Sequence, residues 1–255
     1  MLNGNEFLSE LYSRLDDGNP LYNEGQIQIN IFLNNEMSNH YLEQYKSLLP
    51  KNKSAKILDI GVGEGWFSSI CYKLGYEHIE LADYGCAAKF SDVKDNLEPI
   101  KELHNVETSI KNLLQNEKFH HKYDYIHMSH VIEHIPKYDL IATMDILNKA
   151  LCKNGKLILR TPNLLGPNPF YSLYCTAGHE YGFVPTNLTQ FFEISNFEGI
   201  QIHDLQINNK GFSQLLGGIL RKIYMLNAKI KYRAFEGTFP ETVNPELIMS
   251  GYKKD

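Results

Sequence analysis

The sequence is poor in cysteine, and it has neither a long hydrophobic run nor an excess of basic residues. Its four cysteines lie far apart along 255 residues, which excludes a paired disulfide framework and a zinc-finger spacing. We therefore expect free thiols in a reducing compartment. No stretch approaches the ~18 consecutive apolar residues of a membrane-spanning helix. The formal charge of −5 excludes the basic bias of duplex-binding proteins, so we expect no nucleic-acid partner.

What is present is the composition of an ordinary globular chain, with 43% hydrophobic and 22% charged residues. The first residues lack the basic region and apolar core of a signal peptide, so we expect a cytoplasmic protein. Apolar residues at helical spacing over 41–49 predict an amphipathic helix, which we assign to an N-terminal helical cap at 1–50. Residues 51–255 then form one main domain.

Short apolar segments alternate with helical patterns along this main domain. The predicted strands are 56–60, 78–83, 123–128 and 155–160, the predicted helices are 66–74 and 140–151, and two later strand candidates are 197–205 and 247–252. Strands that alternate with helices are typical of βαβ units around a parallel sheet.

The most informative segment is the glycine-rich turn at 59–65, DIGVGEG, between a predicted strand and a predicted helix. Glycine permits a tight turn and lets a ligand touch the backbone. Trp66 stands where the dinucleotide fingerprint G-x-G-x-x-G needs its third glycine, so that pattern is not met. The carboxylate of Asp59 would repel a pyrophosphate and would favour a cationic ligand, such as the methionine end of S-adenosylmethionine.

A second carboxylate, Asp83, ends the next predicted strand. An acid at this place can accept hydrogen bonds from both hydroxyls of a ribose. A turn-forming Asp is the alternative for this residue taken alone, and the nearby glycine turn favours the ribose.

Three ordered motifs resemble those of the class I S-adenosylmethionine-dependent methyltransferases. Residues 59–65 are similar to motif I of that family. Residues 123–136, YDYIHMSHVIEHIP, and 151–163, LCKNGKLILRTPN, resemble the fourth- and fifth-strand motifs of its ubiquinone-biosynthesis-like branch, methyltransferase types 11, 12 and 23. The resemblance implies an α/β, Rossmann-like fold in three layers, with helices on both sides of a seven-stranded, mostly parallel sheet whose last strand is antiparallel.

The resemblance also implies S-adenosylmethionine as cofactor, with S-adenosylhomocysteine as product. The residues expected to hold it are Asp59, Gly61, Gly63, Gly65, Asp83, Tyr84, Asn112 and Ser129. Members of the family usually carry an acid near the adenine amino group after the third strand. This sequence has none at 109–114, so Asn112 or backbone atoms would take that place.

Methyl transfer is a displacement that requires aligned reactants, and a base of near-neutral pKa helps when the acceptor is a hydroxyl. His134 resembles the histidine of the Glu-His pair in this branch and is the first candidate for the base, followed by His130 and His179. A surface or helix-capping role is the alternative for each histidine. The residues expected to contact the acceptor are Glu133, Arg160, Asn163 and Tyr181.

The spacing His130-x-x-Glu133-His134 also matches an inverted zinc-protease motif, but its position inside a methyltransferase motif argues against a protease. Some ubiquinone-type methyltransferases are thought to hold a divalent ion with an acid-acid-His set at matching positions. Because His130 replaces the first acid here, we assign no metal, and a divalent ion stays an alternative.

A helical insertion is predicted at about 208–242, before the last strand. Residues 210–233 contain six basic residues and no acid, with seven Leu and Ile residues on one helical face and most of the basic residues opposite. Three interpretations stay open for this segment. It packs on the core with a solvated basic face, it forms a dimer contact or a lid over the acceptor, or it binds a membrane surface or lipid carrier. The protein is accordingly expected to be a monomer or a homodimer.

These features predict a methyltransferase that acts on an oxygen of a small polar acceptor, which is a sugar hydroxyl or a phosphate or phosphoramidate group on a nucleotide- or lipid-linked sugar. Branch members similar to this chain often occur in bacterial capsule or surface-polysaccharide pathways. The alternatives are O- or N-methylation of another metabolite such as a quinone precursor, a non-catalytic cofactor-binding module, and a nicotinamide oxidoreductase. The missing fingerprint glycine argues against the last of these.

Overall fold

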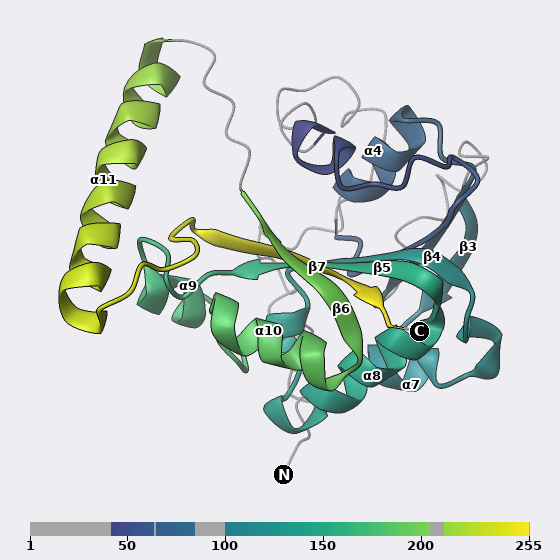
Figure 1. Cartoon of the computed structure of the whole chain (residues 1–255). Helices are drawn as coiled ribbons and strands as arrows, with labels where there is room; N and C mark the ends of the chain where they lie inside the picture. The colour runs from purple at the N-terminus through teal and green to yellow at the C-terminus, as the bar shows by residue number, and fades with distance from the viewer. Residues whose placement is uncertain (1–41, 64, 85–99, 205–211, 255) are drawn as a thin grey trace, which may run out of the picture.

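The strands of this protein form where short runs of apolar residues occur, as in β1 (Lys56–Ile60), where only the first of five residues is exposed. The computed structural model describes residues 42–63, 65–84, 100–204 and 212–254, and it joins seven strands into one sheet in the order β3-β2-β1-β4-β5-β7-β6 (Figure 1). The other strands are β2 (His78–Asp83), β3 (Ile100–Asn105), β4 (Tyr123–Ser129), β5 (Leu151–Pro162), β6 (Phe197–His203) and β7 (Glu246–Lys253).

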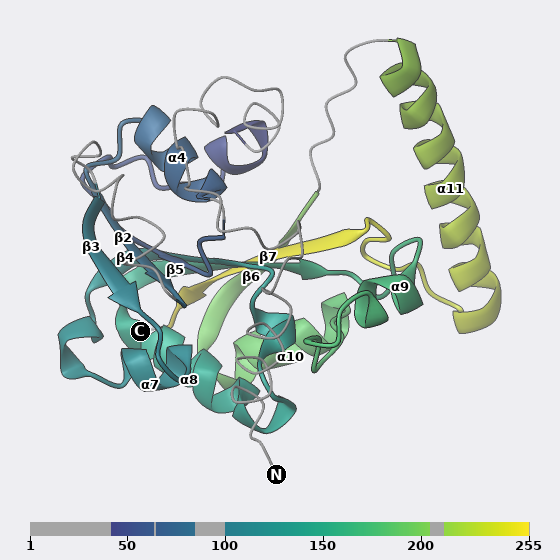
Figure 2. The ribbon, with the colours of Figure 1, turned by 180° about the vertical axis from the view of Figure 1, so that it is seen from behind.

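The sheet is parallel from β3 to β5, whereas β7 runs antiparallel to both of its neighbours, β5 and β6. Helices cover both faces, with α4 on one side and α7, α8 and α10 on the other (Figures 1 and 2). The predicted Rossmann-like α/β fold with an antiparallel last strand is therefore confirmed. The helices are α4 (Trp66–Lys73), α7 (Ile110–Leu114), α8 (Leu140–Ala150), α9 (Pro169–Tyr174), α10 (Pro185–Ile194) and α11 (Phe212–Glu236), with short 3-10 helices η1 (Glu117–Phe119), η2 (Ile132–His134) and η3 (Lys137–Asp139).

Two hydrophobic clusters form the core, one on each face of the sheet, because successive strand residues point to opposite faces. Leu58 of β1 belongs to the cluster beneath α8, and its neighbour Ile57 belongs to the cluster beneath α4. The second cluster also contains Tyr45, which is 1% exposed and lies in a helical segment at 42–46. The predicted N-terminal helix is present there, and the rest of the expected cap, up to residue 41, lies outside the described residues.

β5 differs from its predicted bounds, because it begins at Leu151 directly after α8 rather than at 155. Its first residue pairs with Tyr123, and the register then shifts so that Lys156 pairs with Tyr125. Asn154, with a φ of +60°, lies in this irregular stretch. The strand that we predicted is thus the regular part of a longer strand that starts with a bulge.

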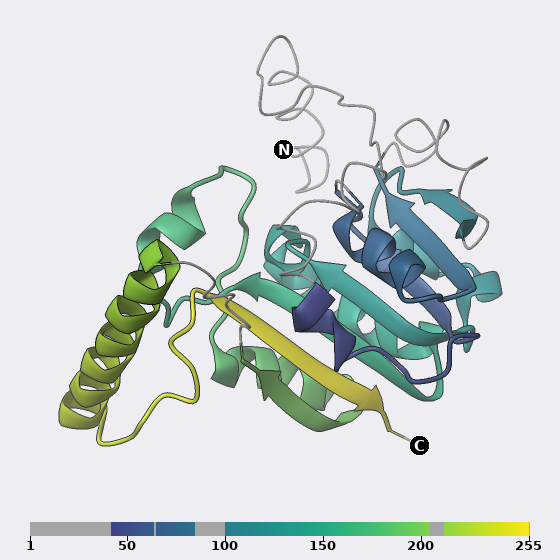
Figure 3. The ribbon, with the colours of Figure 1, turned by 90° about the horizontal axis from the view of Figure 1, so that it is seen from above.

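α11 fills the predicted insertion and stands at the side of the molecule, apart from the sheet and its covering helices (Figures 1, 2 and 3). Six of its apolar side chains are 48–61% exposed, namely Leu216, Ile219, Leu220, Ile223, Leu226 and Ile230. None of the helix's described side chains belongs to either core cluster. A helix packed on the core with its basic face in solvent is therefore the wrong interpretation.

Two further findings bear on the composition. Within the described part of the chain, no helix combines the length and the apolar character that crossing a bilayer requires. Cys71, Cys152 and Cys175 are free thiols, and Cys86 lies outside the described residues.

Candidate functional site

The carboxyl ends of the parallel strands bring the predicted cofactor residues to one edge of the sheet. The register pairs Ile60 of β1 with Ala82 of β2 and with Met128 of β4. The residues that follow these three, Gly61, Asp83 and Ser129, therefore lie next to one another. In open α/β sheets, ligands bind outside this edge.

The glycine turn adopts backbone angles that favour glycine, with φ values of +70° at Gly61, +52° at Gly63 and +80° at Gly65. The Gly61 N–H donates to the carbonyl of Ala82 at 2.9 Å. A Cβ at Gly61 would lie 2.0 Å from Cγ2 of Val131, whereas a Cβ at Gly63 would meet no heavy atom within 4 Å. Gly61 therefore serves close packing, and Gly63 leaves a stretch of backbone open to a ligand.

Asp83 ties the turn to the end of β2. Its Oδ2 accepts a hydrogen bond from the Gly63 N–H at 3.0 Å, and its Oδ1 accepts one from the Tyr84 N–H at 2.7 Å. A carboxylate oxygen can accept more than one hydrogen bond, so Asp83 retains capacity for the hydroxyls of a ribose. Its position beside the open backbone of Gly63 suits the ribose role, which stays a prediction.

Tyr84 and Asn112 meet at the loop that follows β3. The Tyr84 hydroxyl donates to the carbonyl of Thr108 at 3.0 Å, and the Asn112 amide donates to the Thr108 hydroxyl at 2.8 Å. Burial raises the pKa of Tyr84, and the charge of Asp83 adds to this effect. The two residues thus share Thr108 as a hydrogen-bond partner, and their contact with an adenine stays a prediction.

Asp59 lies beneath the turn rather than at its open side. Its side chain is 2% exposed, its Oδ2 accepts from the Ser68 hydroxyl at 2.6 Å, and its Oδ1 lies 2.8 Å from Nδ1 of His127. The Nε2 of His127 lies 3.0 Å from the Tyr45 hydroxyl, and the Phe67 ring stacks on His127 with ring centroids 3.7 Å apart. The Asp59 carboxylate therefore joins the end of β1 to α4 and β4 beneath the turn, and its contact with a ligand stays a prediction.

His127 is a residue that the sequence interpretation missed. The only available signal was that Asp59 and His127 are polar residues in the middle of buried strands. The register then pairs these two positions. Such a pairing becomes visible only once the strand order is known.

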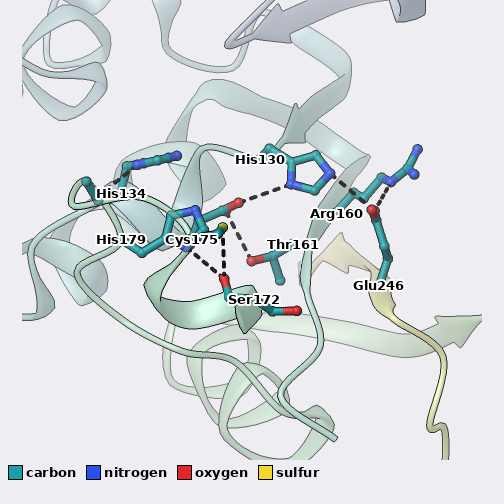
Figure 4. A network of polar contacts seen from close by, with 10 residues as sticks. His130, His134, Arg160, Thr161, Ser172, Cys175, His179 and Glu246 are labelled. Atoms are coloured by element: carbon teal, nitrogen blue, oxygen red, sulfur yellow. Dashed lines mark hydrogen bonds and ion pairs between the residues drawn. The ribbon is translucent and has the colours of Figure 1, made fainter. Parts of the chain in front are cut away.

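His134 is positioned to accept a proton. Its Nδ1 lies 2.9 Å from the carbonyl oxygen of Gly178, which can only accept, so Nδ1 carries the hydrogen and Nε2 the lone pair (Figure 4). Burial lowers the pKa of His134, and the charges of His179 and His130 lower it further against the opposing influence of Glu133. The ring is therefore neutral at pH 7, as a base must be.

His179 lies beside His134, and its ring is held through the same nitrogen. Its Nδ1 lies 2.9 Å from the carbonyl oxygen of Ser172, and the two rings meet edge to face with centroids 4.8 Å apart. Both imidazoles thus direct Nδ1 to a backbone carbonyl of the 163–183 loop (Figure 4). The structure brings the first and third of the predicted catalytic histidines together.

His130 is the wrong candidate for a base. Its Nδ1 lies 3.2 Å from Glu133 Oε1, and its Nε2 lies 3.2 Å from Glu246 Oε2. Burial alone would lower its pKa, but the hydrogen bonds and charges of these two carboxylates raise it to about 9. A histidine that is already protonated at pH 7 cannot accept a proton.

Glu133 and Arg160 belong to the same network of hydrogen bonds and ion pairs. The Glu133 side chain is 2% exposed, and its Oε2 accepts from the Thr161 hydroxyl at 3.1 Å. Arg160 is 6% exposed and donates through Nε to Glu246. Burial would raise the pKa of Glu246, but His130 and Arg160 lower it to about 2. The side chains of Glu133 and Arg160 are thus both engaged in internal ion pairs, and their contacts with an acceptor stay predictions.

Asn163 is also structural, and Tyr181 keeps its candidate role. Asn163 is fully buried, its Nδ2 donates to the carbonyl of Asn244 at 2.8 Å, and its Oδ1 accepts from the Leu165 N–H at 3.0 Å. Its predicted contact with the acceptor is therefore wrong. Tyr181 and His179 border a narrow crevice that leaves no room for a water molecule, and its wall also includes Glu133, Thr161, Ser172 and Phe183.

A divalent ion would find ligands at this place. Glu133, His134 and His179 each offer one ligand atom, and these atoms lie within 4.8 Å of one another. Metal-binding histidines usually donate their second ring N–H to a carbonyl, as both histidines do here. His130, which the sequence places in the corresponding motif, is not part of this set.

Comparison with known proteins gives a family match and several similar structures. The sequence matches the model of the methyltransferase domain family over residues 33–202. Among curated proteins, none has detectable sequence similarity.

Three solved structures illustrate the shared fold. A SAM-dependent methyltransferase from Archaeoglobus fulgidus is 16% identical with a TM-score of 0.58, over 85% of this chain and 94% of that one. The 1,6-didemethyltoxoflavin-N1-methyltransferase of Burkholderia thailandensis, with bound 1,6-didemethyltoxoflavin and S-adenosylhomocysteine, is 12% identical with a TM-score of 0.58. The match covers 100% of this chain and 92% of that one. Phosphoethanolamine N-methyltransferase 2 of Haemonchus contortus, with phosphomonomethylethanolamine and S-adenosylhomocysteine, is 16% identical with a TM-score of 0.61. The match covers 100% of this chain and 61% of that one.

Proposed function

Because the chain belongs to the methyltransferase domain family, we propose that it transfers the methyl group of S-adenosylmethionine to a hydroxyl oxygen of a small polar acceptor. The observation that carries this proposal is the free Nε2 of His134. Nδ1 of the same ring is held by the Gly178 carbonyl, and no partner of Nε2 is found among the described residues. A hydroxyl needs such a base, whereas a neutral amine does not.

The edge of the sheet fits the methyl donor. The open backbone at Gly63 and the adjacent carboxylate of Asp83 would hold its nucleoside, and Tyr84 and Asn112 would flank its adenine ring. The buried carboxylate of Asp59 ties the strand before the turn to α4, the helix after it, and to β4. When bound, the donor supplies an electrophilic methyl group on a positively charged sulfur.

The chain's own residues then act on the acceptor. With the donor bound, Nε2 of His134 would take the hydroxyl proton of the acceptor as its oxygen becomes methylated and S-adenosylhomocysteine is released. The imidazolium that forms later returns its proton to water. Positioned general bases typically accelerate such steps ~10²–10⁴-fold. His179, whose ring lies beside His134, and Tyr181, which borders the same narrow crevice as His179, would orient the acceptor.

The first experiment identifies the acceptor and then tests His134. Fractions of a bacterial extract are incubated with the full chain and isotopically labelled S-adenosylmethionine, and mass spectrometry identifies the labelled product. With that acceptor, His134→Gln should lower turnover ~100-fold or more while calorimetry gives a near-normal affinity for S-adenosylmethionine. His121→Gln, a change in an exposed turn, is the matched control and should leave turnover unchanged. Normal turnover of His134→Gln would exclude His134 as the base.

Product analysis tests the chemistry of the acceptor. Two of the similar structures are N-methyltransferases, so a methyl group found on nitrogen would refute the O-transfer proposal in favour of amine methylation. A methyl group found on a sugar hydroxyl would support it, whereas one found on an ionised phosphate-type oxygen would refute the role of His134 as the base, because such an oxygen carries no proton. The resemblance to capsule-modifying methyltransferases favours such acceptors and is the only support for a capsule role. No heat of binding with S-adenosylmethionine would indicate a non-catalytic module.

A further inference from the structure

We infer that α11 docks this protein on an anionic membrane surface, with its apolar stripe inserted between lipid headgroups. This inference is independent of the proposed acceptor chemistry. It rests on the side of the helix that faces solvent, on the placement of its charges, and on the absence of a matching acidic surface on the helix itself.

The apolar stripe of α11 faces outward. At 100° per residue, the six exposed Leu and Ile side chains between 216 and 230 fall on one side of the helix. The partly shielded residues lie on the other side, for example Arg221, Met225, Ala228 and Tyr232. An amphipathic helix of a folded protein normally turns its apolar stripe towards the core, so this reversed orientation requires another apolar partner.

Four of the five basic residues of α11 border this stripe, and the fifth, Arg221, lies on the opposite side. Lys222, Lys229 and Arg233 project along one edge of the stripe, and Lys231 projects along the other. Long basic side chains at such edges can reach the headgroup region while their methylene groups stay with the apolar surface. This combination is typical of helices that lie in the membrane interface.

Charge distinguishes an anionic membrane from a second copy of the chain. The helix carries five basic residues and a single acid, Glu236. If two copies of α11 packed stripe against stripe in antiparallel fashion, Lys222, Lys229 and Arg233 of one would lie beside the same residues of the other. Anionic lipids would instead neutralise these residues, so the charges favour a membrane over self-association.

The test measures binding of the full chain to vesicles. Vesicles of equal parts phosphatidylglycerol and phosphatidylcholine should sediment the protein, vesicles of phosphatidylcholine alone should bind it much less, and high salt should weaken binding to the first. Equal binding to both vesicle types, or no binding to either, would overturn the proposal.

Variants of the stripe test whether α11 makes the contact. Ile223→Glu and Leu226→Glu should each weaken binding to the anionic vesicles roughly tenfold, because each places a charge in the inserted face. Ile141→Glu is the matched control, since Ile141 is 50% exposed on α8, and it should bind as the unmodified protein does. Calorimetry with S-adenosylmethionine verifies that each variant is folded. An unchanged affinity of the two α11 variants would overturn the inference.

A charge-reversal variant tests the border of the stripe. Each basic residue near an anionic surface contributes ~1 kcal/mol, a factor of about five in binding. Lys222→Glu, Lys229→Glu and Arg233→Glu together should therefore weaken vesicle binding by roughly a hundredfold or more. If the protein instead ignores vesicles and forms dimers in analytical ultracentrifugation that Ile223→Glu dissociates, the occupant of the stripe is a second copy and the inference is wrong.

Discussion

Replacing Gly61 by alanine should be among the most damaging small changes in this protein, and its cost can be divided into two parts. The φ of +70° is unfavourable for a residue with a Cβ by ~1–2 kcal/mol. The new Cβ would also lie 2.0 Å from Cγ2 of Val131, and such overpacking costs ~1–3 kcal/mol. The free energy of unfolding should therefore fall by about 2–5 kcal/mol, measured by urea denaturation at neutral pH.

Two further variants separate the parts. Gly63→Ala shares the left-handed backbone, with a φ of +52°, but its Cβ meets no heavy atom within 4 Å, so it should lose only ~1–2 kcal/mol. Val131→Ala, combined with Gly61→Ala, should restore the share of the unfolding free energy that the clash with Val131 removes. A double-mutant cycle with the two single variants measures the coupling energy between positions 61 and 131 directly. A Gly61→Ala variant as stable as Gly63→Ala, or a cycle without coupling, would refute the packing argument.

Three further outcomes are expected. Asp83→Asn should weaken S-adenosylmethionine binding in calorimetry roughly tenfold, because hydrogen bonds to a charged acceptor contribute ~1.5–3 kcal/mol, whereas Gly75→Ala, remote from the edge, should not. The pKa of His130 is raised to about 9, above its unfolded value, so its stabilising contribution is complete below about pH 6.5 and is lost as the pH rises through about 9. Between neutral and strongly alkaline pH, the free energy of unfolding measured by urea denaturation should therefore fall less for Glu246→Gln than for the unmodified protein. Because no metal is assigned, a chelator should leave turnover unchanged, and a loss restored by one divalent ion would instead identify the two-histidine, one-carboxylate set as its site.

Much of the fold was predictable because local patterns encode it. β1 and β2 have the predicted bounds, since each is a short apolar run next to turn residues. β3 was not assigned, because the edge strand Ile100–Asn105 is largely polar and only two of its residues are buried. The amphipathic character of α11 was also visible, but periodicity identifies an apolar face without showing what that face meets.

The candidate site was predictable to a smaller extent. The glycine turn and Asp83 follow from a contiguous motif, and the structure places them at one edge. The partners that decide each histidine's function come from distant parts of the chain. Glu246 determines the charge of His130, and the carbonyl of Gly178 determines the tautomer of His134. No local sequence pattern reveals these pairs, because they form only when β7 and the 163–183 loop close on the end of β4.

The way in which His134 and His179 are held has a consequence for how this protein can diversify. Both rings are oriented by main-chain carbonyls, of Gly178 and Ser172, and not by the side chains of the loop. Every amino acid offers a carbonyl, so a mutation that preserves the course of the loop preserves the tautomer of both histidines. Apart from His179 itself and the buried Asn163, the segment 163–183 can therefore exchange its side chains to suit a new acceptor without rebuilding the proton acceptor, which makes it the natural segment to randomise when a new methylation specificity is sought.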